Sequence, residues 1–260
     1  MRTLLITGGS SGIGKATVEL FAQRGWQVYE LSRHGESGNN ICHIYCDVTD
    51  CKSVTDAVAQ VLQQAERLDV VIANAGFGIS GTVEFTTDEE VRHQFDVNFF
   101  GALHVAQAVL PQLRKQRGGT LIFTSSVAAV LSVPYQAFYS ATKAAINAMA
   151  LALQNEVRDF GIHVSVLMPG DVATGFTAAR DKSEAGEDIY SSAHKAVATM
   201  EHDEQNGMGA HQMAKCFWHI ANKRNPAPQY IGGASYKLLC FLDRLLPKRL
   251  VNWIEYKVYS

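Results

Sequence analysis

Short runs of apolar and β-branched residues alternate along this chain with amphipathic segments of helix length, and this alternation limits its fold more than any other feature. Strands are predicted over residues 3–7, 27–32, 41–46, 70–73, 120–124, 163–168 and 229–231. Helices are predicted between them, among others over residues 13–24, from Thr87 past Asn98 to about residue 116, and over 139–159. Such repetition is typical of parallel sheets that helices cover on both faces. We therefore expect a single α/β domain with a doubly wound parallel sheet.

The composition agrees with such a domain and excludes several classes of protein. The chain has 260 residues, of which 47% are hydrophobic and 18% charged, enough for a large core and unlike a disordered chain. Its formal net charge of −2 provides no basic field for nucleic acid. The five cysteines have no metal-binding spacing, so we expect reduced thiols, no metal site and a cytoplasmic location. Without a signal-like start or a run of ~18–20 apolar residues, the chain is expected to be soluble or at most peripheral.

A glycine-rich loop, TGGSSGIG from Thr7 to Gly14, connects the first predicted strand to the first helix. Glycine there lets backbone N–H groups approach a pyrophosphate at the positive end of the helix, where a Cβ would block the approach. Gly8, Gly12 and Gly14 are spaced G-x-x-x-G-x-G, which differs from the general G-x-G-x-x-G fingerprint. The position of the loop predicts dinucleotide binding, and a purely structural turn is the alternative.

The end of the second predicted strand bears on which dinucleotide is bound. Here Ser32 and Arg33 follow Leu31, and no carboxylate comes directly after the strand. A serine and an arginine at this place can hydrogen-bond and charge-pair with the 2′-phosphate of NADP. Glu30 lies within the strand and is the argument for NAD, while Arg33 could also be an ordinary solvated residue. We expect NADP(H) to be preferred and NAD(H) to be possible.

A catalytic pair is predicted from YSATK, where Tyr139 and Lys143 are four residues apart and share one helix face. A phenol with a pKa near ~10 exchanges protons poorly at neutral pH, and a nearby ammonium is expected to lower that pKa. Such a tyrosine suits general acid–base catalysis. Ser125 and Ser126 follow the preceding strand and are candidates to hydrogen-bond a substrate oxygen. The alternative is a plain pair on a surface helix.

Taken together, these motifs resemble the classical short-chain dehydrogenase/reductase family, in order and over roughly residues 1–235. The matching segments are Thr7 to Gly14, Asp47-Val48, Asn74-Ala75-Gly76, Asn98, Ser126, Tyr139-x-x-x-Lys143 and Pro169-Gly170 with Thr174. The resemblance implies a Rossmann-type fold and NAD(P)(H)-dependent interconversion of a carbonyl and a secondary alcohol. It also implies that Tyr139 exchanges the proton, Ser126 rather than Ser125 orients the oxygen, Lys143 holds the nicotinamide ribose and depresses the tyrosine pKa, and Asn98 anchors a water in a proton relay.

The resemblance also implies a set of cofactor-binding residues. Asp47 and Val48 would line the adenine pocket, residues 74–76 would secure the central sheet, and Thr174 would meet the carboxamide or the phosphates. Ser11 stands where many NADP-using members carry a basic residue, so Arg33 supports the NADP prediction nearly alone. The full set is Gly8, Ser10, Ser11, Gly12, Ile13, Gly14, Ser32, Arg33, Asp47, Val48, Asn74, Ala75, Gly76, Tyr139, Lys143, Pro169, Gly170, Val172 and Thr174.

Alternatives to this function remain. One is an NAD-linked alcohol dehydrogenase of the same family, and another is a non-catalytic dinucleotide sensor or scaffold. The complete set of Asn98, Ser126, Tyr139 and Lys143 favours catalysis, and the three-residue gap between the last two argues against an enoyl reductase. The family resemblance also implies a homodimer or homotetramer, formed through the two long helices around residues 98–116 and 139–159.

Residues of about 175–208 occupy the family's substrate-loop position. An apolar lid over the substrate is expected there, and the carboxylates of this stretch are expected to be a solvated face rather than a cation site. The candidate lid residues are Phe176, Ile189, Tyr190, Val197 and Met200.

The last segment, residues 236–260, reads as an amphipathic helical extension. Leu238, Leu242 and Leu245 share a helical face, Pro247 ends the run, and a second helix is expected near Lys248. We expect this extension to pack on the protein's own core or on a second subunit in preference to a membrane interface. Its apolar character also suggests an apolar or lipid-like carbonyl substrate, with the extension forming part of the pocket wall or its entrance.

Overall fold

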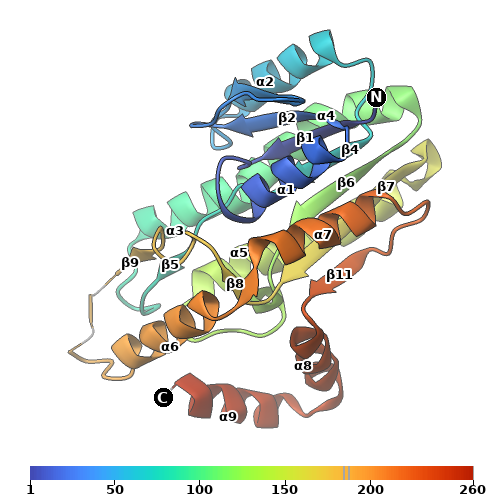
Figure 1. The fold of residues 1–260 in the computed structure, drawn as a ribbon. Helices are drawn as coiled ribbons and strands as arrows, with labels where there is room; N and C mark the ends of the chain where they lie inside the picture. The colour runs from blue at the N-terminus through green and yellow to red at the C-terminus, as the bar shows by residue number, and fades with distance from the viewer. Residues whose placement is uncertain (184, 187, 260) are drawn as a thin grey trace.

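The computed structural model describes residues 1–183, 185–186 and 188–259, and a seven-stranded parallel sheet runs through its centre (Figure 1). The strand order is β11-β7-β6-β4-β1-β2-β3. Strands β2 and β3 are therefore added on one side of β1, and the strands from β4 onward are added on its other side. The predicted doubly wound, Rossmann-type fold is confirmed, and the strands lie almost where the sequence places them. They are β1 Thr3–Thr7, β2 Gln27–Ser32, β3 Ile41–Tyr45, β4 Val70–Ala73, β6 Gly119–Thr124, β7 Ile162–Pro169 and β11 Gln229–Gly232.

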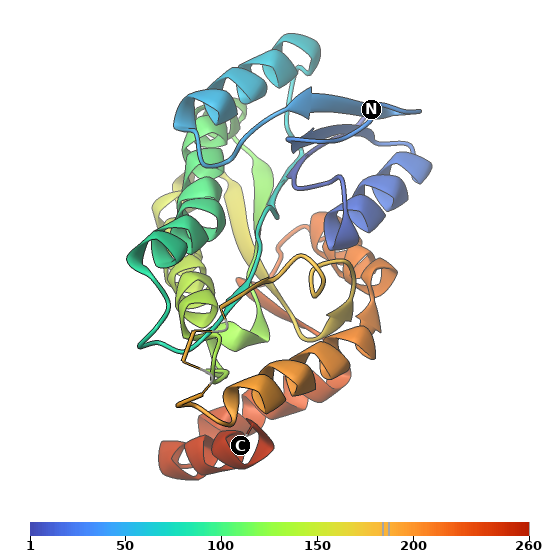
Figure 2. The same cartoon turned by 90° about the vertical axis from the view of Figure 1, so that its left-hand side faces the viewer.

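Helices cover both faces of this sheet, as Figure 2 shows. One face carries α1 (Gly12–Gln23) and α7 (Ala210–Ala221), and the other carries α2 (Cys51–Gln64), α4 (Gly101–Gln116) and α5 (Ala137–Glu156). Successive side chains of a strand point to opposite faces, so Leu4 and Ile6 pack with Phe217 while Leu5 packs toward the other layer. Burial on both faces explains why the strands are apolar throughout.

Helix α3 (Asp88–Phe95) begins where the sequence predicts, because Thr87 and Glu90 form a capping box. The Thr87 Oγ accepts a hydrogen bond from the Glu90 N–H at 3.2 Å, and the Glu90 carboxylate accepts one from the Thr87 N–H at 2.7 Å. A π-helical turn, Asp96–Phe100, then joins α3 to α4. Asn98 lies in this turn and is completely buried, so the helix expected to run past Asn98 continues there through a wider turn.

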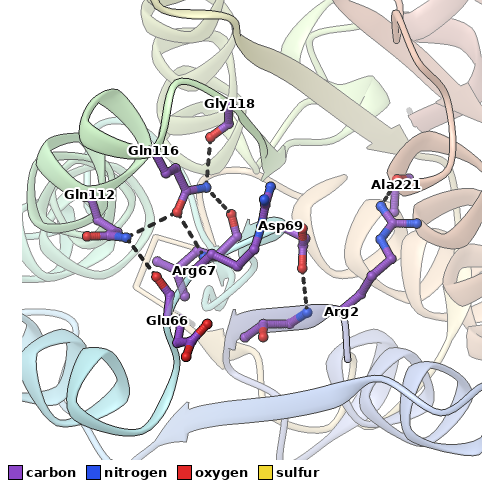
Figure 3. A network of polar contacts seen from close by, with 10 residues as sticks. Arg2, Glu66, Arg67, Asp69, Gln112, Gln116, Gly118 and Ala221 are labelled. Atoms are coloured by element: carbon purple, nitrogen blue, oxygen red, sulfur yellow. Dashed lines mark hydrogen bonds and ion pairs between the residues drawn. The ribbon is translucent and has the colours of Figure 1, made fainter.

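The amino-terminal ends of the strands are fastened by polar contacts among residues that are not candidate site residues (Figure 3). Gln116 donates to the backbone oxygens of Leu68 and Gly118 at 2.6 and 2.8 Å, which ties α4 to the starts of β4 and β6. Asp69 accepts from the N–H of Thr3 at 2.8 Å and pairs with Arg67 at 2.9 Å. These contacts therefore hold the strands in register at their amino ends, whereas the candidate site residues follow their carboxyl ends.

The segment expected to be the substrate loop is folded onto the body of the protein. Short parallel pairs join β5 (Ile79–Ser80) to β9 (Asp181–Lys182) and β8 (Val172–Ala173) to β10 (Met208–Gly209), and α6 is Ala193–Gln205. The Lys182 ammonium pairs with Glu201 of α6 at 2.5 Å. Two short 3-10 turns, Val127–Ala129 and Arg158–Phe160, complete the structure around β6 and α5.

The C-terminal extension forms two helices, α8 (Ala234–Leu245) and α9 (Lys248–Tyr259), with Pro247 between them, as predicted. Most of its apolar side chains are exposed, so the protein's own core covers only part of the extension, and packing on a second subunit stays a prediction. Five helices already cover both faces of the sheet, and the α8–α9 hairpin lies outside them (Figure 1). Among the described residues, no helix has the length and apolar composition needed to cross a bilayer.

Candidate active site

The glycine-rich loop between β1 and α1 is built for close approach by a ligand. Gly8 and Gly12 have φ angles of +65° and +51°, a region that side chains disfavour. A Cβ on Gly14 would lie 2.0 Å from the Gly8 carbonyl oxygen, so only glycine fits there. Ser11 caps α1 without a side-chain hydrogen bond, which leaves the positive end of the helix open toward the cavity. These features fit the pyrophosphate of a dinucleotide.

Asn74 fastens this loop to the neighbouring strands. Its amide donates to the carbonyls of Thr7 and Gly8, both at 3.1 Å, and its own oxygen accepts from the Thr124 hydroxyl at 3.2 Å. Strands β1, β4 and β6 are therefore joined at their carboxyl ends, beside the point between β1 and β4 where the strand order switches sides. Parallel sheets bind ligands at this place.

At the end of β2, Glu30 and Arg33 have different environments. Glu30 is buried, and its two oxygens are engaged by the Gly9 N–H at 2.9 Å and by the His43 ring at 2.6 Å. Arg33 is exposed and borders the cavity. The hydroxyl of Ser32 donates to the His34 carbonyl at 2.9 Å, so it would have to turn to donate to a phosphate. Glu30 thus supports the glycine loop and is already occupied, which removes the argument for a ribose-binding carboxylate at this position.

Tyr139 and Lys143 project from α5 into the same cavity, as their spacing predicts. The Lys143 Nζ lies 5.6 Å from the centre of the Tyr139 ring and donates to the Thr124 carbonyl at 3.0 Å. Ser125 donates to the Lys143 carbonyl at 3.0 Å and so fastens the helix to the end of β6. The oxygen of Ser126 accepts from the Ala128 N–H at 3.1 Å, and its hydroxyl hydrogen-bonds the phenol of Tyr139. Of the two serines, Ser126 is therefore the one beside the Tyr139 hydroxyl.

Burial dominates the proton affinities of this pair. Burial raises the pKa of Tyr139 to about 12, and the carboxylates of Glu204 and Asp171 contribute to the rise. A hydrogen bond with Ser126 acts in the opposite direction and lowers this pKa. Burial also lowers the pKa of Lys143 to about 8. The net shift of the tyrosine pKa is opposite to the lowering that the ammonium was expected to cause, because desolvation of the phenol is its largest cause.

Asn98 stands behind the cavity rather than in its wall. Its amide donates to the Phe77 carbonyl at 3.0 Å and to the Thr142 hydroxyl at 3.1 Å, and its oxygen accepts from the Phe77 N–H at 3.0 Å. Both amide protons are thus in use within the protein. Every other residue of the predicted catalytic and cofactor-binding sets lines one cavity of about 760 Å³.

The cavity also has walls that the sequence analysis missed. Asp171 follows Pro169-Gly170 and receives a hydrogen bond from Tyr236, while Asp203 and Glu204 belong to the acidic stretch that was expected to be a solvated face. Asp203 is exposed at the cavity, in keeping with that expectation, whereas Glu204 is half-buried and pairs with Arg180. The sequence feature that could have identified Asp203 and Glu204 as lining residues is their position in the segment expected to be the substrate loop. Further lining residues that the sequence analysis did not predict include Phe77, His93, Gln136, Asp181 and Tyr259.

The apolar lid is only partly as expected. Phe176 lies against Tyr139, with ring centres 5.8 Å apart, and Met200 also lines the cavity. Ile189 is exposed, and the Tyr190 hydroxyl bonds to Glu84 at 2.7 Å. Neither of these two residues, nor Val197, is among the residues that line the cavity. Arg180 pairs with Glu204 and holds the lid segment to α6.

Comparison with known proteins identifies the family of this chain. The family model described as short chain dehydrogenase matches residues 2–185. A 3-ketodihydrosphingosine reductase of Bacteroides thetaiotaomicron is 40% identical over 227 residues, which cover 86% of this chain and 84% of that protein. An NADPH-dependent 3-dehydrocapnine reductase of Ornithobacterium rhinotracheale is 29% identical over 279 residues, covering 99% and 97%.

A solved structure shows the same fold over nearly the whole length. The short-chain dehydrogenase of Streptomyces avermitilis is similar with a TM-score of 0.84 and 28% identity, covering 98% of this chain and 97% of that one. Family, fold and the arrangement of the cavity therefore agree. This chain belongs to the short-chain dehydrogenase/reductase family and is an NAD(P)-dependent oxidoreductase that acts on CH–OH and C=O groups.

Proposed function

We propose that this enzyme uses NADPH to reduce the keto group of a long-chain amino ketone of the 3-ketodihydrosphingosine type. The observation that carries the proposal is the mixed wall beyond Tyr139, where Asp171, Asp203 and Glu204 lie together with apolar side chains of Phe176 and Met200. The compound in the relative's name is a long-chain ketone with an amino group beside the carbonyl, so it combines an ammonium with an alkyl chain. Carboxylates complement the ammonium, and the apolar side chains complement the alkyl chain.

The electrostatics of the wall support binding of a cation. Burial raises the pKa of Asp171, and the neighbouring Glu204 and Asp203 raise it further. Arg180 compensates Glu204, and Tyr236 bonds to Asp171, but Asp203 has no partner of opposite charge among the described contacts. An ammonium bound here would relieve the repulsion among the carboxylates.

The catalytic roles follow from the positions of the protons. Bound NADPH would supply the hydride. Tyr139, whose raised pKa keeps its proton at neutral pH, gives that proton to the developing alkoxide, and Ser126 donates a hydrogen bond to the same oxygen. Lys143 holds the nicotinamide ribose. Asn98 keeps the relay role that the resemblance implies, and both protons of its side-chain amide are bonded within the protein.

Preference for NADP(H) is part of the proposal. Glu30 is occupied beneath the glycine loop, and exposed Arg33 borders the part of the cavity nearest the end of β2. A guanidinium there pairs with a 2′-phosphate, and no free carboxylate repels it from the end of the strand.

Assembly and location complete the proposal. A homodimer or homotetramer formed through α4 and α5 would cover Phe100 and Leu151, which are 43% and 39% exposed. The five cysteines are free thiols, as suits the reducing cytoplasm.

The test is NADPH oxidation with 3-ketodihydrosphingosine and with a ketone of equal chain length that lacks the amino group. A charge-assisted contact is worth roughly 1.5–3 kcal/mol, so kcat/KM should favour the amino ketone about ten- to a hundredfold. Asp203→Asn should remove much of this preference, while Asp159→Asn, on the exposed turn after α5, should leave it unchanged. Tyr139→Phe should abolish turnover of both ketones and still bind NADPH. Equal kcat/KM for the two ketones would reject recognition of the ammonium.

A further inference from the structure

The α8–α9 hairpin (residues 234–259) turns its apolar face away from the protein. On α8, Tyr236, Cys240 and Asp243 form the side that meets the body. At 3.6 residues per turn, the opposite side carries five large apolar residues that are 37–65% exposed. These are Leu238, Leu239, Phe241, Leu242 and Leu245.

Helix α9 repeats the pattern. Val251, Glu255 and Tyr259 are half-buried on its inner side, and α9 contains no fully buried residue. Three apolar residues on its outer side, Leu250, Trp253 and Ile254, are 41–57% exposed, and Val258 beside the inner side is 51% exposed. A helix of a soluble domain normally turns its apolar stripe to the core, and both helices here do the reverse. Among the described residues, no other part of the chain covers either of these two apolar faces.

The charges around this surface decide what it fits. Lys237, Arg244, Arg249 and Lys257 are exposed on the hairpin. The acidic side chains do not balance them, because Asp243 is bonded to Lys248 at 2.6 and 2.7 Å and Glu255 is half-buried. An apolar face bordered by cations and bearing an exposed tryptophan complements an anionic lipid surface. A second copy of the hairpin would instead bring like charges together.

The hairpin also lies beside the entrance to the active site. Tyr259, the last described residue of α9, lines the cavity, and Figures 1 and 2 show the hairpin next to α6 at one end of the molecule. We propose that the α8–α9 hairpin docks this enzyme on membranes that contain anionic lipid, with its apolar face in the boundary between headgroups and acyl chains. The enzyme lies on such a membrane without spanning it. The proposal does not depend on which ketone is reduced.

The test is flotation of the full chain with vesicles made of equal parts phosphatidylcholine and phosphatidylglycerol, and with vesicles of phosphatidylcholine alone. The protein should float with the mixed vesicles and bind the neutral ones more weakly. Arg249→Gln should lower partitioning onto the mixed vesicles about fivefold, and Trp253→Glu should abolish flotation. Tyr45→Glu is the matched control, because Tyr45 is 63% exposed on the edge strand β3, away from the hairpin.

Fluorescence gives a second readout, because Trp26 is buried while Trp253 is exposed. A blue shift of the emission on adding mixed vesicles, lost in Trp253→Phe, would support docking. Failure of the full chain to float with anionic vesicles would overturn the proposal. A dimer by light scattering that Trp253→Glu converts to a monomer would show that a second copy covers the surface instead. Turnover of a water-soluble short ketone without vesicles shows that each variant is folded and separates this failure from failure of the proposed activity.

Discussion

Lys143 is the residue at which stability and catalysis oppose each other. Its side chain is almost completely buried, and its ammonium is held by the Thr124 carbonyl. Burial lowers the pKa of Lys143 from 10.5 to about 8. The folded state therefore holds this charge less favourably than the unfolded state does, and the enzyme keeps the lysine for its contact with the cofactor and its place beside Tyr139.

Replacing Lys143 with methionine should abolish turnover and yet stabilise the protein at pH 7. A shift of about 2.5 units, from 10.5 to 8, corresponds to about 3 kcal/mol, and the lost hydrogen bond offsets about 1 kcal/mol of it. Because the folded pKa is lowered, the wild-type free energy of unfolding should rise between pH 8 and 10.5, and the advantage of the variant should shrink there. Urea unfolding across this pH range measures both. A variant less stable than wild type at pH 7 would contradict the argument.

Arg33→Ala tests cofactor selectivity at the residue scale. Loss of one charge-assisted phosphate contact, roughly 1.5–3 kcal/mol, should weaken NADPH binding about ten- to a hundredfold and leave NADH binding nearly unchanged. Calorimetric titration of both cofactors measures this, with Arg24→Ala at the end of α1 as the control. If the unmodified protein bound the two cofactors equally, the proposed role of Arg33 would be wrong.

At the scale of elements, each wall of the cavity is the end of a different helix or strand. The β1–α1 loop, the end of β6, the start of α5 and the end of β7 surround the reaction centre, and α6 and α9 close the substrate side. The first four are neighbours in one sheet or directly follow its strands. Helix α9 reaches the cavity only through Tyr259, at the far end of the chain, where burial raises the pKa of Tyr259 to about 12.

Tyr259→Ala should therefore act on binding of the substrate chain and not on chemistry. Removing a partly buried aromatic wall costs roughly 1.5 kcal/mol, so KM for a long-chain ketone should rise about tenfold with little change in kcat. A short-chain ketone should be unaffected. Tyr256→Ala, on the exposed side of the same helix, is the matched control. Steady-state kinetics in the absence of vesicles distinguishes the two variants, and an equal effect of both would exclude a specific wall contact by Tyr259.

On the scale of the whole molecule, the parallel sheet separates stability from function. The carboxyl ends of the strands carry the cavity, and the amino ends carry the polar network of Figure 3. A substitution in the polar network is therefore separated from the cavity by about the length of a strand. Mutations at the two edges should therefore have separable effects on stability and on ligand binding.

Asp69→Ala tests this separation. It leaves the Thr3 N–H without its acceptor and removes the partner of Arg67, which should cost about 1–3 kcal/mol. At about 2–4 °C per kcal/mol for a chain near this size, Tm should fall by roughly 2–12 °C. The Kd for NADPH should not change. Calorimetric unfolding and cofactor titration on the same samples check both, and a weakened Kd would show that the two edges are coupled.

Much of the fold could be predicted because its signals are local. The strands follow from apolar runs bounded by turns, α3 from a capping box at Thr87, and the glycine loop from the backbone space needed by Gly8 and Gly14. Helical spacing also placed Tyr139 and Lys143 on one face of α5. None of these predictions required knowledge of what lies across the molecule.

The sequence by itself thus determined the doubly wound sheet, the glycine loop and the Tyr139–Lys143 pair that face its cavity, and the two helices of the extension. Only the tertiary structure decided the raised pKa of Tyr139, the occupation of Glu30 by Gly9 and His43, and the outward apolar face of the α8–α9 hairpin. The physical reason is the range of the interactions. Periodicity and backbone conformation depend on near neighbours in sequence, whereas burial and electrostatic fields depend on side chains that folding brings together from distant parts of the chain.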